Sequence, residues 1–508
     1  MHILILYTCI ASLVLWSFIY DRDLKPLSKL LQSLFTICFI VLLFTIFWSN
    51  ENLSATIFHL AKDLLIVSIA AFLAQKLRSN KIALFIYAGM LYILIPQIHK
   101  IAPSVSEDNQ SKIAELGEII IELPSDVSQE TLQEISDKTG GTLSLAFDPL
   151  DRSYNMDEYY LLDIEDQNEV EKTIRTLKII EEIRWAEINE ILKLPTTEAI
   201  DAKNLFRSDF FNDPGVSKQW SVKTLNYAGL HRTLKNISPK KRALVAVLDG
   251  GVYGKHEDLR DNYVSTKASY DKDTNSHGTH CAGIIAAVSN NGKGISSMVP
   301  DKSWVQVTSI KVMNNFGFGT QSQIIKGIIE AADLGADVIS MSIGGISNQV
   351  REKAYSDAIA YANSKGTIVV VASGNSNVNA RKSTPGNAKG VIGVAAIDTM
   401  LKKSHFSNTM EDIEMPLGAP GTNIFSTVVG NKYKTMNGTS MAAPHVAAIV
   451  AIMKAIKPKI STKEAFSILN DTGKKSNNTK LTGKIIQPDK AIEKLIGSKR
   501  IFSRYGRD

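Results

Sequence analysis

Cysteine is scarce in this 508-residue sequence, where it occurs three times. Cys9 and Cys38 lie inside long apolar runs, so Cys281 is the single cysteine of the more polar remainder of the chain. That remainder cannot form an internal disulfide, and its fold must depend on its hydrophobic core. The cysteine count does not decide the cellular compartment.

An excess of charge of one sign is also lacking. The chain has 57 Lys and Arg against 51 Asp and Glu, a formal net charge of +6, and no dense basic block. Nucleic-acid binding normally requires a basic patch or stripe, so we expect no nucleic-acid partner. A chain of this length is too long for one ordinary core, and two or three domains are expected.

Long apolar runs are confined to the first hundred residues. We expect a membrane module over residues 1–105 with four transmembrane segments, at residues 3–20, 30–48, 56–74 and 82–98. Three of them are clean runs near the ~20 residues needed to cross the hydrocarbon core. The third contains Lys62 and Asp63, which can pair or extend toward the nearer interface.

Basic residues are distributed unevenly over the connections between these segments. The connections at residues 21–29 and 75–81 carry Lys and Arg, whereas residues 49–52 and the start of the chain carry none. The positive-inside rule then places both termini, and everything after residue 100, outside the cytoplasm. A cleaved signal peptide is not expected, because no basic stretch precedes the first apolar segment and no small-residue cleavage site follows it. We therefore expect a multi-pass membrane protein with lipid as a partner.

The region 106–195 has short alternating elements. Strands are predicted over residues 117–124, 141–147, 157–164 and 181–189, with helices over 128–140 and 167–178. This β-α-β-β-α-β order is that of a ferredoxin-like α+β unit. By itself the order does not indicate a function, because this fold hosts many roles. A linker with a Pro-Gly turn follows it.

The region 196–508 alternates apolar strands with helices from residue 242 onward. Strands are predicted over residues 243–249, 305–313, 336–344, 366–374 and 390–398, and helices over 321–334, 349–364, 440–456 and 462–470. Continuous apolar strands with crossover helices indicate an α/β, doubly wound parallel sheet. Functional groups in such sheets gather beyond the carboxyl ends of the strands.

Four polar residues occupy such positions. Asp249 ends the first strand, His277 precedes a helix of small residues, Asn375 follows the fourth strand, and Ser440 opens an apolar helix. A nucleophilic serine needs a base, a group that orients the base, and donors for the oxyanion. Each residue alone also fits a structural role, as a turn residue or a helix cap.

His277 and His280 form an H-x-x-H pair, which makes a metal pair an alternative interpretation. Neither an H-E-x-x-H motif nor a clear third ligand accompanies it. His280 falls inside the predicted helix, where structural packing is the simpler role.

Five motifs occur in one order: "VAVLDGGV", "HGTHCAGIIAA", "SMSIGG", "ASGNS" and "NGTSMAAPHVAA". Together they resemble the subtilisin-like serine proteases, over residues 213–492. The resemblance implies that Asp249, His277 and Ser440 form the catalytic triad, and that Asn375 and the Ser440 amide form the oxyanion hole. It also implies substrate-binding residues, which are Ser342, Ile343, Gly344, Gly345, Ala372, Ser373 and Gly374.

The resemblance has further implications for the whole chain. It makes the protein a serine endopeptidase acting on proteins or peptides, with no cofactor required for chemistry. The 106–195 region becomes a prodomain whose tail occupies the active site, with self-cleavage expected between Leu194 and Gly215. Asp258 and Asn290 become candidate calcium ligands, although Asp258 is alternatively a turn aspartate. One departure stands out, because the family usually has Ser or Thr where this sequence has Gly250.

Two alternatives to a general endopeptidase stay open at this point. One is a membrane sensor or scaffold whose protease-like domain only binds. The other is a signalling protease that cuts only itself or one partner.

Overall fold

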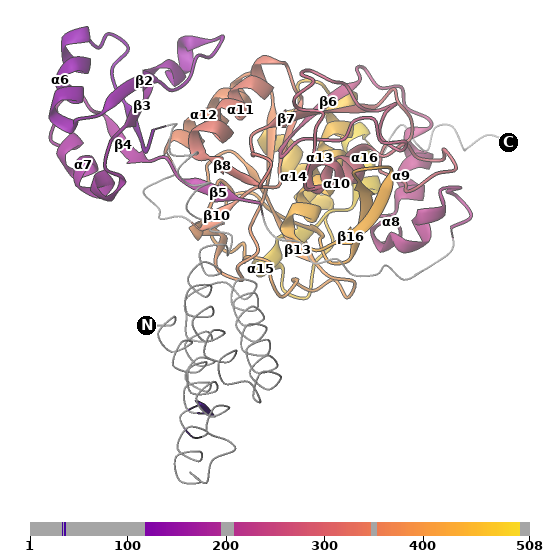
Figure 1. Ribbon diagram of the computed structural model, residues 1–508. Coiled ribbons are helices and arrows are strands. Elements are labelled where there is room, and N and C mark those ends of the chain that lie inside the picture. Colours follow the sequence, from indigo (N-terminus) through magenta and orange to yellow (C-terminus); the bar gives the residue numbers. More distant parts are fainter. Residues whose placement is uncertain (1–32, 34, 37–116, 195–207, 347–352, 498–508) are drawn as a thin grey trace, which may run out of the picture. The chain divides into compact units, whose positions relative to one another are not determined.

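The computed structural model describes residues 33, 35, 36, 117–194, 208–346 and 353–497 (Figure 1). The chain divides into two compact units, Met1–Lys112 and Ile113–Asp508. The four expected transmembrane segments lie outside the described residues, except for three helical positions within residues 33–36. Among the described residues, helix α13 (Thr439–Ile456) alone has the length and hydropathy to cross a membrane, and it is buried within the second unit.

A small antiparallel sheet begins the second unit. Its strands are β1 (Ile119–Glu122), β2 (Thr142–Leu145), β3 (Tyr159–Asp163) and β4 (Trp185–Ile188), in the order β2-β3-β1-β4. Helices α6 (Gln129–Thr139) and α7 (Val170–Leu177) complete it, in the chain order that the sequence predicts. Side chains alternate across the sheet. Ile119 and Ile121 pack beneath the two helices, whereas Ile120 faces the opposite way.

The large sheet has seven parallel strands in the order β17-β14-β13-β11-β9-β6-β7. The strands are β6 (Ala243–Asp249), β7 (Val305–Lys311), β9 (Val338–Met341), β11 (Ile368–Ala372), β13 (Ile392–Ile397), β14 (Pro416–Pro420) and β17 (Lys484–Ile485). The sequence predicts the first five and misses the last two. The neighbours of β6 are β7 and β9, so the strand order reverses at β6, the position where α/β sheets bind ligands.

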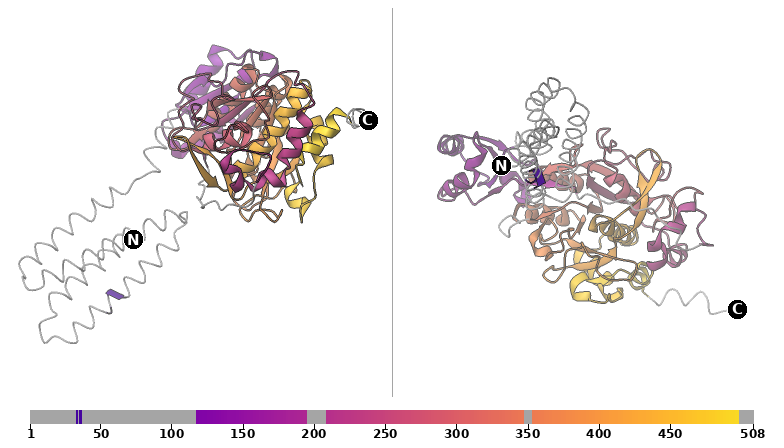
Figure 2. Two further views of the ribbon diagram at one scale, coloured as in Figure 1. Left: turned by 90° about the vertical axis from the view of Figure 1, so that its right-hand side faces the viewer. Right: turned by 60° about the horizontal axis from the view of Figure 1, so that its bottom comes forward.

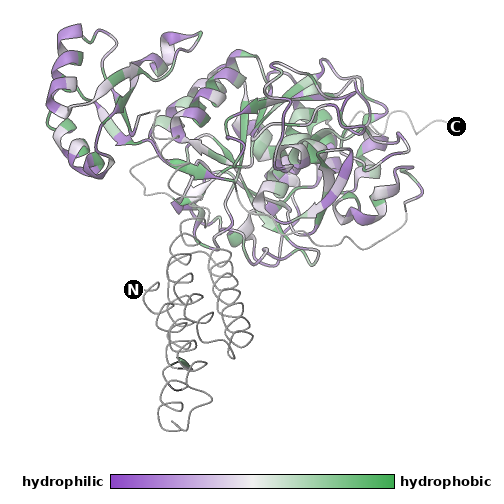
Figure 3. Ribbon diagram, viewed as in Figure 1, coloured by the Kyte–Doolittle hydropathy of each residue, from purple (hydrophilic) through white to green (hydrophobic). Residues whose placement is uncertain are grey.

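Helices cover both faces of this sheet (Figures 1 and 2). One face carries α9 (Tyr227–Leu234), α10 (His277–Ala286), α13, α14 (Thr462–Thr472) and α16 (Pro488–Ile496), and the other carries α11 (Gln321–Asp333) and α12 (Lys353–Ser364). Val245 and Val247 of β6 point to the first group, and Ala246 and Leu248 to the second. Burial on both faces explains the apolar strands and the apolar α13 in Figure 3.

Several shorter helices and strands lie between these elements. They are α8 (Trp220–Thr224), α15 (Thr479–Thr482), the paired strands β10 (Gly345–Ile346) and β12 (Ser383–Thr384), and the hairpin of β15 (Ile424–Val428) and β16 (Lys432–Met436).

The small domain joins the large one through its uncovered sheet face and its C-terminal strand. Ile120, Tyr159 and Leu161 share a hydrophobic cluster with α11 and α12. Strand β5 (Ile191–Lys193) then leaves the small domain and pairs antiparallel with β8 (Phe318–Thr320). The small domain thus lies against the α11 and α12 face and extends one strand into the large domain.

Candidate active site

Asp249 is the last residue of β6 and is completely buried. Its Oδ1 accepts a hydrogen bond from the Gly250 amide at 2.7 Å, and its Oδ2 lies 2.8 Å from His277 Nδ1. A buried carboxylate of this kind needs partners, and the imidazole is one of them. Asp249 therefore fixes the His277 ring by holding Nδ1 as a donor.

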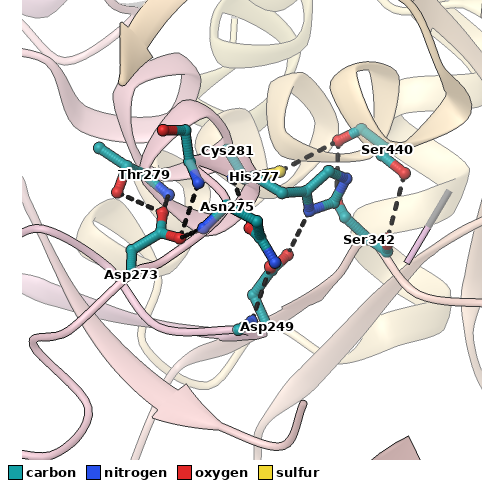
Figure 4. Close-up of polar contacts among 10 residues, drawn as sticks. Asp249, Asp273, Asn275, His277, Thr279, Cys281, Ser342 and Ser440 are labelled. Atoms are coloured by element: carbon teal, nitrogen blue, oxygen red, sulfur yellow. Dashed lines mark hydrogen bonds and ion pairs between the residues drawn. The ribbon is translucent and has the colours of Figure 1, made fainter. Parts of the chain in front are cut away.

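His277 is the first residue of α10, and a second buried carboxylate holds the start of that helix. Asp273 Oδ1 accepts hydrogen bonds from the amides of Asn275 and Ser276, at 3.0 and 2.8 Å. Its Oδ2 accepts from the amide and hydroxyl of Thr279, at 2.9 and 2.5 Å. Figure 4 shows this cluster beside the His277 ring. Sequence reasoning missed Asp273, although an aspartate just ahead of a helix start is a recognised capping pattern.

The environment of His277 favours its charged form. Burial opposes the imidazolium, but the charge and hydrogen bond of Asp249, with a contribution from Asp273, raise the pKa of His277 above its usual 6.5. His277 Nε2 is buried and has no hydrogen-bond partner among the described residues. An imidazole held at Nδ1, with a free Nε2, can receive a proton there.

Ser440 is the second residue of α13, which begins at Thr439 with Gly438 as its N-cap. The expectation that Ser440 itself caps the helix is therefore wrong by two positions. Its hydroxyl donates to the Ser342 carbonyl at 3.1 Å. In Figure 4 the imidazole lies between the Asp249 carboxylate and Ser440. The structure thus brings the three predicted residues together, with the serine hydroxyl turned to Ser342.

Pro444 determines which groups donate hydrogen bonds to the Ser440 carbonyl. It is the sixth residue of α13, beyond the first turn in which proline is readily tolerated. Proline has no N–H, so the helical bond that would end on the Ser440 carbonyl cannot form. That carbonyl instead accepts the Ser342 hydroxyl at 2.7 Å and the Cys281 thiol at 3.4 Å. The position of the serine is therefore fixed by β9 and α10 as well as by its own helix.

Asn375 lies near the start of α13. Its Oδ1 accepts hydrogen bonds from the amide and the hydroxyl of Thr439, at 2.9 and 2.8 Å. With Oδ1 engaged, its Nδ2 is available as a donor next to Gly438, where a Cβ would lie 3.4 Å away. This geometry suits the oxyanion role that the resemblance implies.

The expected substrate-binding residues follow neighbouring strands. Ser342, Ile343, Gly344 and Gly345 come after β9, and Ser373 and Gly374 come after Ala372, which ends β11. Gly374 has φ +99 and its amide donates to the Thr439 hydroxyl. Because β6, β9 and β11 are adjacent, their ends form one edge that contains Asp249 and both of these segments.

His280 does not form a metal pair with His277. Its Nε2 lies 3.1 and 3.0 Å from the carbonyl oxygens of Ile424 and Lys434, so this nitrogen carries a hydrogen. Burial lowers the pKa of His280 to about 3. Within the described residues, one group of His, Cys, Asp and Glu side chains is close enough to share a metal, and it is Asp249, His277 and Cys281. Burial raises the pKa of the Cys281 thiol well above its usual range, which leaves it a poor ligand.

Comparison with known proteins identifies the family of this chain. The subtilase family model matches residues 240–487. Subtilisin DY from Bacillus licheniformis is 37% identical over 235 residues, which cover 45% of this chain and 82% of that protein. The chain belongs to the subtilase family.

Other relatives agree with this assignment. Thermitase from Thermoactinomyces vulgaris is 38% identical over 223 residues, or 43% of this subtilase and 77% of thermitase. A solved protease structure from Pseudoalteromonas arctica matches with a TM-score of 0.50 at 29% identity, and covers 56% of this subtilase and all of that chain. This subtilase is a subtilisin-like serine endopeptidase with a subtilisin-like α/β fold.

Calcium is common in subtilases, and Asp258 and Asn290 are its candidate ligands in this subtilase. Asp258 is fully buried, and burial raises its pKa to about 7. Its two oxygens accept the Asn291 side-chain amide at 2.7 Å and the Ile295 amide at 2.8 Å. Asn290 Oδ1 accepts the Asn212 amide at 3.0 Å. Calcium needs six to eight oxygen ligands, whereas N–H groups face these oxygens. Each carboxylate oxygen of Asp258 has a second acceptor site beyond these bonds, and calcium at Asp258 stays a prediction.

Proposed function

We propose that Ser440 is the nucleophile, that His277 is the general base and then the general acid, and that Asp249 orients His277. The 2.8 Å contact between Asp249 Oδ2 and His277 Nδ1 carries this proposal. It assigns the ring hydrogen to Nδ1 and leaves Nε2 as the acceptor on the side of Ser440.

The reaction begins with a rotation of the Ser440 side chain. Its hydroxyl leaves the Ser342 carbonyl and donates to His277 Nε2. The oxygen attacks the peptide carbonyl carbon while Nε2 takes the proton, and the oxyanion accepts hydrogen bonds from the Ser440 amide and Asn375 Nδ2. The Ser440 amide is available because the first amides of a helix have no acceptor within it. His277 then protonates the leaving amine, and water releases the acyl group by the reverse sequence.

We further propose that the 106–195 region is an inhibitory prodomain. The pairing of β5 with β8 supports this, because an extended strand added to a cleft edge is how peptides bind. The Leu194 amide extends the pairing by donating to the Gly317 carbonyl at 2.7 Å. The Leu194 side chain lies beside Gly250, the residue after Asp249. The tail of the small domain thus approaches the triad in the manner of a substrate.

Polar contacts around the starts of α11 and α12 support the same proposal. Lys353, the first described residue of α12, lies 2.6 Å from Glu122 of β1. At α11, the Gln321 side chain donates to Glu187 at 2.7 Å, and the Ser322 amide donates to Asn189 at 2.9 Å. Side-chain oxygens at a helix N-terminus satisfy the free amides there, as Asn189 does for Ser322. The small domain therefore satisfies groups that the large domain would otherwise leave to water.

We also propose that residues 1–105 anchor the enzyme in a membrane, with the catalytic domain and both termini outside the cytoplasm. The support is the sequence pattern, with its four apolar segments and its alternation of basic connections. Self-cleavage between Leu194 and Gly215 would then release the catalytic domain from its covalent membrane link.

The test uses the full chain with a tag at each end, in membranes. Wild type is expected to yield two fragments, with the N-terminal fragment resisting alkaline extraction, and to degrade unfolded casein. Ser440→Ala is expected to stay at full length and to leave casein intact, because no nucleophile remains. Ser467→Ala, an exposed serine on α14, is the control and should behave as wild type. Full-length bands in both wild type and Ser440→Ala would overturn self-cleavage, and intact casein with wild type would overturn the endopeptidase assignment.

A further inference from the structure

The tail strand β5 buries alternate side chains. Leu192 and Leu194 are 2% and 7% exposed and belong to the large domain's hydrophobic cluster, whereas Ile191 and Lys193 are exposed. This alternation is the period of an extended strand with one face in a cleft. The cleft therefore receives two leucine side chains, spaced two residues apart.

Glycines line the place where Leu194 lies. A Cβ built on Gly317 would lie 3.4 Å from Leu194 Cβ. A Cβ on Gly250 would lie 3.7 Å from Leu194 Cδ1 and 3.1 Å from the side-chain nitrogen of Asn275. For a Cβ at position 250, the 3.7 Å distance to Leu194 is ordinary contact, and the 3.1 Å distance to Asn275 is tight. A side chain that extends from this Cβ toward Leu194 or Asn275 would therefore press on them.

The backbone does not explain Gly250. Its φ lies outside the left-handed region that favours glycine, in contrast to Gly251 with φ +114. The Gly250 amide donates to Asp249 Oδ1, a bond that any residue except proline could make. The absence of a side chain, rather than a special backbone conformation, is what glycine contributes at position 250.

We propose that Gly250 is a specificity-determining residue. By omitting the Ser or Thr side chain usual in the family, it opens the subsite that receives Leu194, so that the enzyme prefers substrates with leucine at that position and at the position of Leu192. This inference rests on the proposed function of β5 as a substrate-like tail. It also gives a role to the one residue at which the triad motifs of this chain depart from the family.

The test compares matched peptides on one protein sample. Quenched fluorescent peptides that span residues 189–198 carry Leu or Ala at position 194, and a second pair carries Leu or Ala at position 192. Wild type, Gly250→Ala and Gly250→Thr are each expressed from the full chain and assayed in detergent. The measured quantity is the Leu-to-Ala ratio of kcat/KM within each sample, which cancels any loss of folded enzyme.

Wild type is expected to favour Leu at position 194 by about tenfold or more, since each methylene in an apolar subsite contributes such factors. Gly250→Thr should abolish or reverse that ratio, with Gly250→Ala intermediate, while the ratio at position 192 stays unchanged. A Leu preference at position 194 that survives in Gly250→Thr would overturn the inference and leave the endopeptidase assignment intact. A parallel loss of both ratios would overturn it too, because it would indicate general damage to the cleft. If wild type cuts none of the peptides, the substrate-like role of β5 fails and the inference fails with it.

Discussion

Replacing Asp273 with asparagine should weaken both the fold and the catalytic base. The carboxylate accepts hydrogen bonds from the amides of Asn275, Ser276 and Thr279 and from the Thr279 hydroxyl. These donors surround the start of α10, where His277 is the first residue. The Ser276 side chain makes no capping bond, so Asp273, together with Asn275 Oδ1, which accepts the His277 amide at 2.9 Å, provides the side-chain caps described for this helix.

The magnitude follows from the number of donors left without an acceptor. Asparagine replaces one oxygen with NH2, which cannot accept, so two of the four bonds are lost. Hydrogen bonds to charged groups contribute about 1.5–3 kcal/mol each. Burial raises the pKa of Asp273, which means that burial disfavours the charged carboxylate. Replacing it with a neutral amide therefore recovers part of the free energy lost with the two hydrogen bonds. We expect a net loss of about 3 kcal/mol in the free energy of unfolding, at the low end of two such bonds. The melting temperature should fall by about 6–12 °C, at roughly 2–4 °C per kcal/mol.

Two measurements check Asp273→Asn. Thermal unfolding is followed in the Ser440→Ala chain, where self-cleavage cannot interfere, and kcat/KM against pH is measured in the active chain. The activity should fall about tenfold or more, since small displacements of a catalytic group have large effects. Its acid limb should move to lower pH, because the charge of Asp273 contributes to the raised pKa of His277.

The matched control is Asp261→Asn. Asp261 is exposed and lies 3.7 Å from the exposed Arg260, a surface pair that should contribute less than about 1 kcal/mol. A melting temperature for Asp273→Asn equal to that of Asp261→Asn, with an unchanged pH profile, would refute the capping role of Asp273.

Two further predictions concern pH. Protonated His277 cannot accept the Ser440 proton, and the pKa of His277 is raised. We therefore expect kcat/KM to rise with pH through a pKa above 6.5. An acid limb below that value would contradict the role of His277 as the base. Burial raises the pKa of Glu187 from 4.5 to about 7, so the interface is most stable below pH 4.5 and should weaken as pH rises through 7. In the Ser440→Ala chain, Glu187→Gln should reduce the difference in melting temperature between about pH 5 and pH 8. A difference as large as in the parent chain would exclude Glu187 as its source.

Much of the fold could be predicted because its strands are buried on both faces. The segment "ALVAVLD" is apolar throughout, and β6 follows it from Ala243 to Asp249. Strand β14 is different, since "PLGAP" has two prolines and a glycine, residues disfavoured in strands. It becomes a strand because β13 and β17 pair with it on either side. Such pairing is tertiary information that local sequence does not contain.

The proximity of the candidate site residues could be predicted from the sequence, but their hydrogen-bond geometry could not, and their roles stay a prediction. Asp249, His277 and Ser440 were recognisable from motifs, and the structure brings them together. The Ser440 hydroxyl rests on Ser342, which depends on side-chain rotation and a distant carbonyl. The surroundings of the calcium candidate depend on geometry in the same way. Asp258 has the correct ligand chemistry, but the neighbouring N–H groups that engage it cannot be located from sequence.

Pro444 has a consequence for the stage of folding at which the enzyme becomes proteolytically active. The carbonyl it leaves unbonded is held by Cys281 and Ser342, which lie 159 and 98 residues earlier in the chain. A partly folded chain can already contain the helix, yet its serine lacks these two anchors. In the proposed mechanism Ser440 therefore reaches its working position only after α10 and the segment that follows β9 are packed, which ties proteolytic competence to completion of the fold.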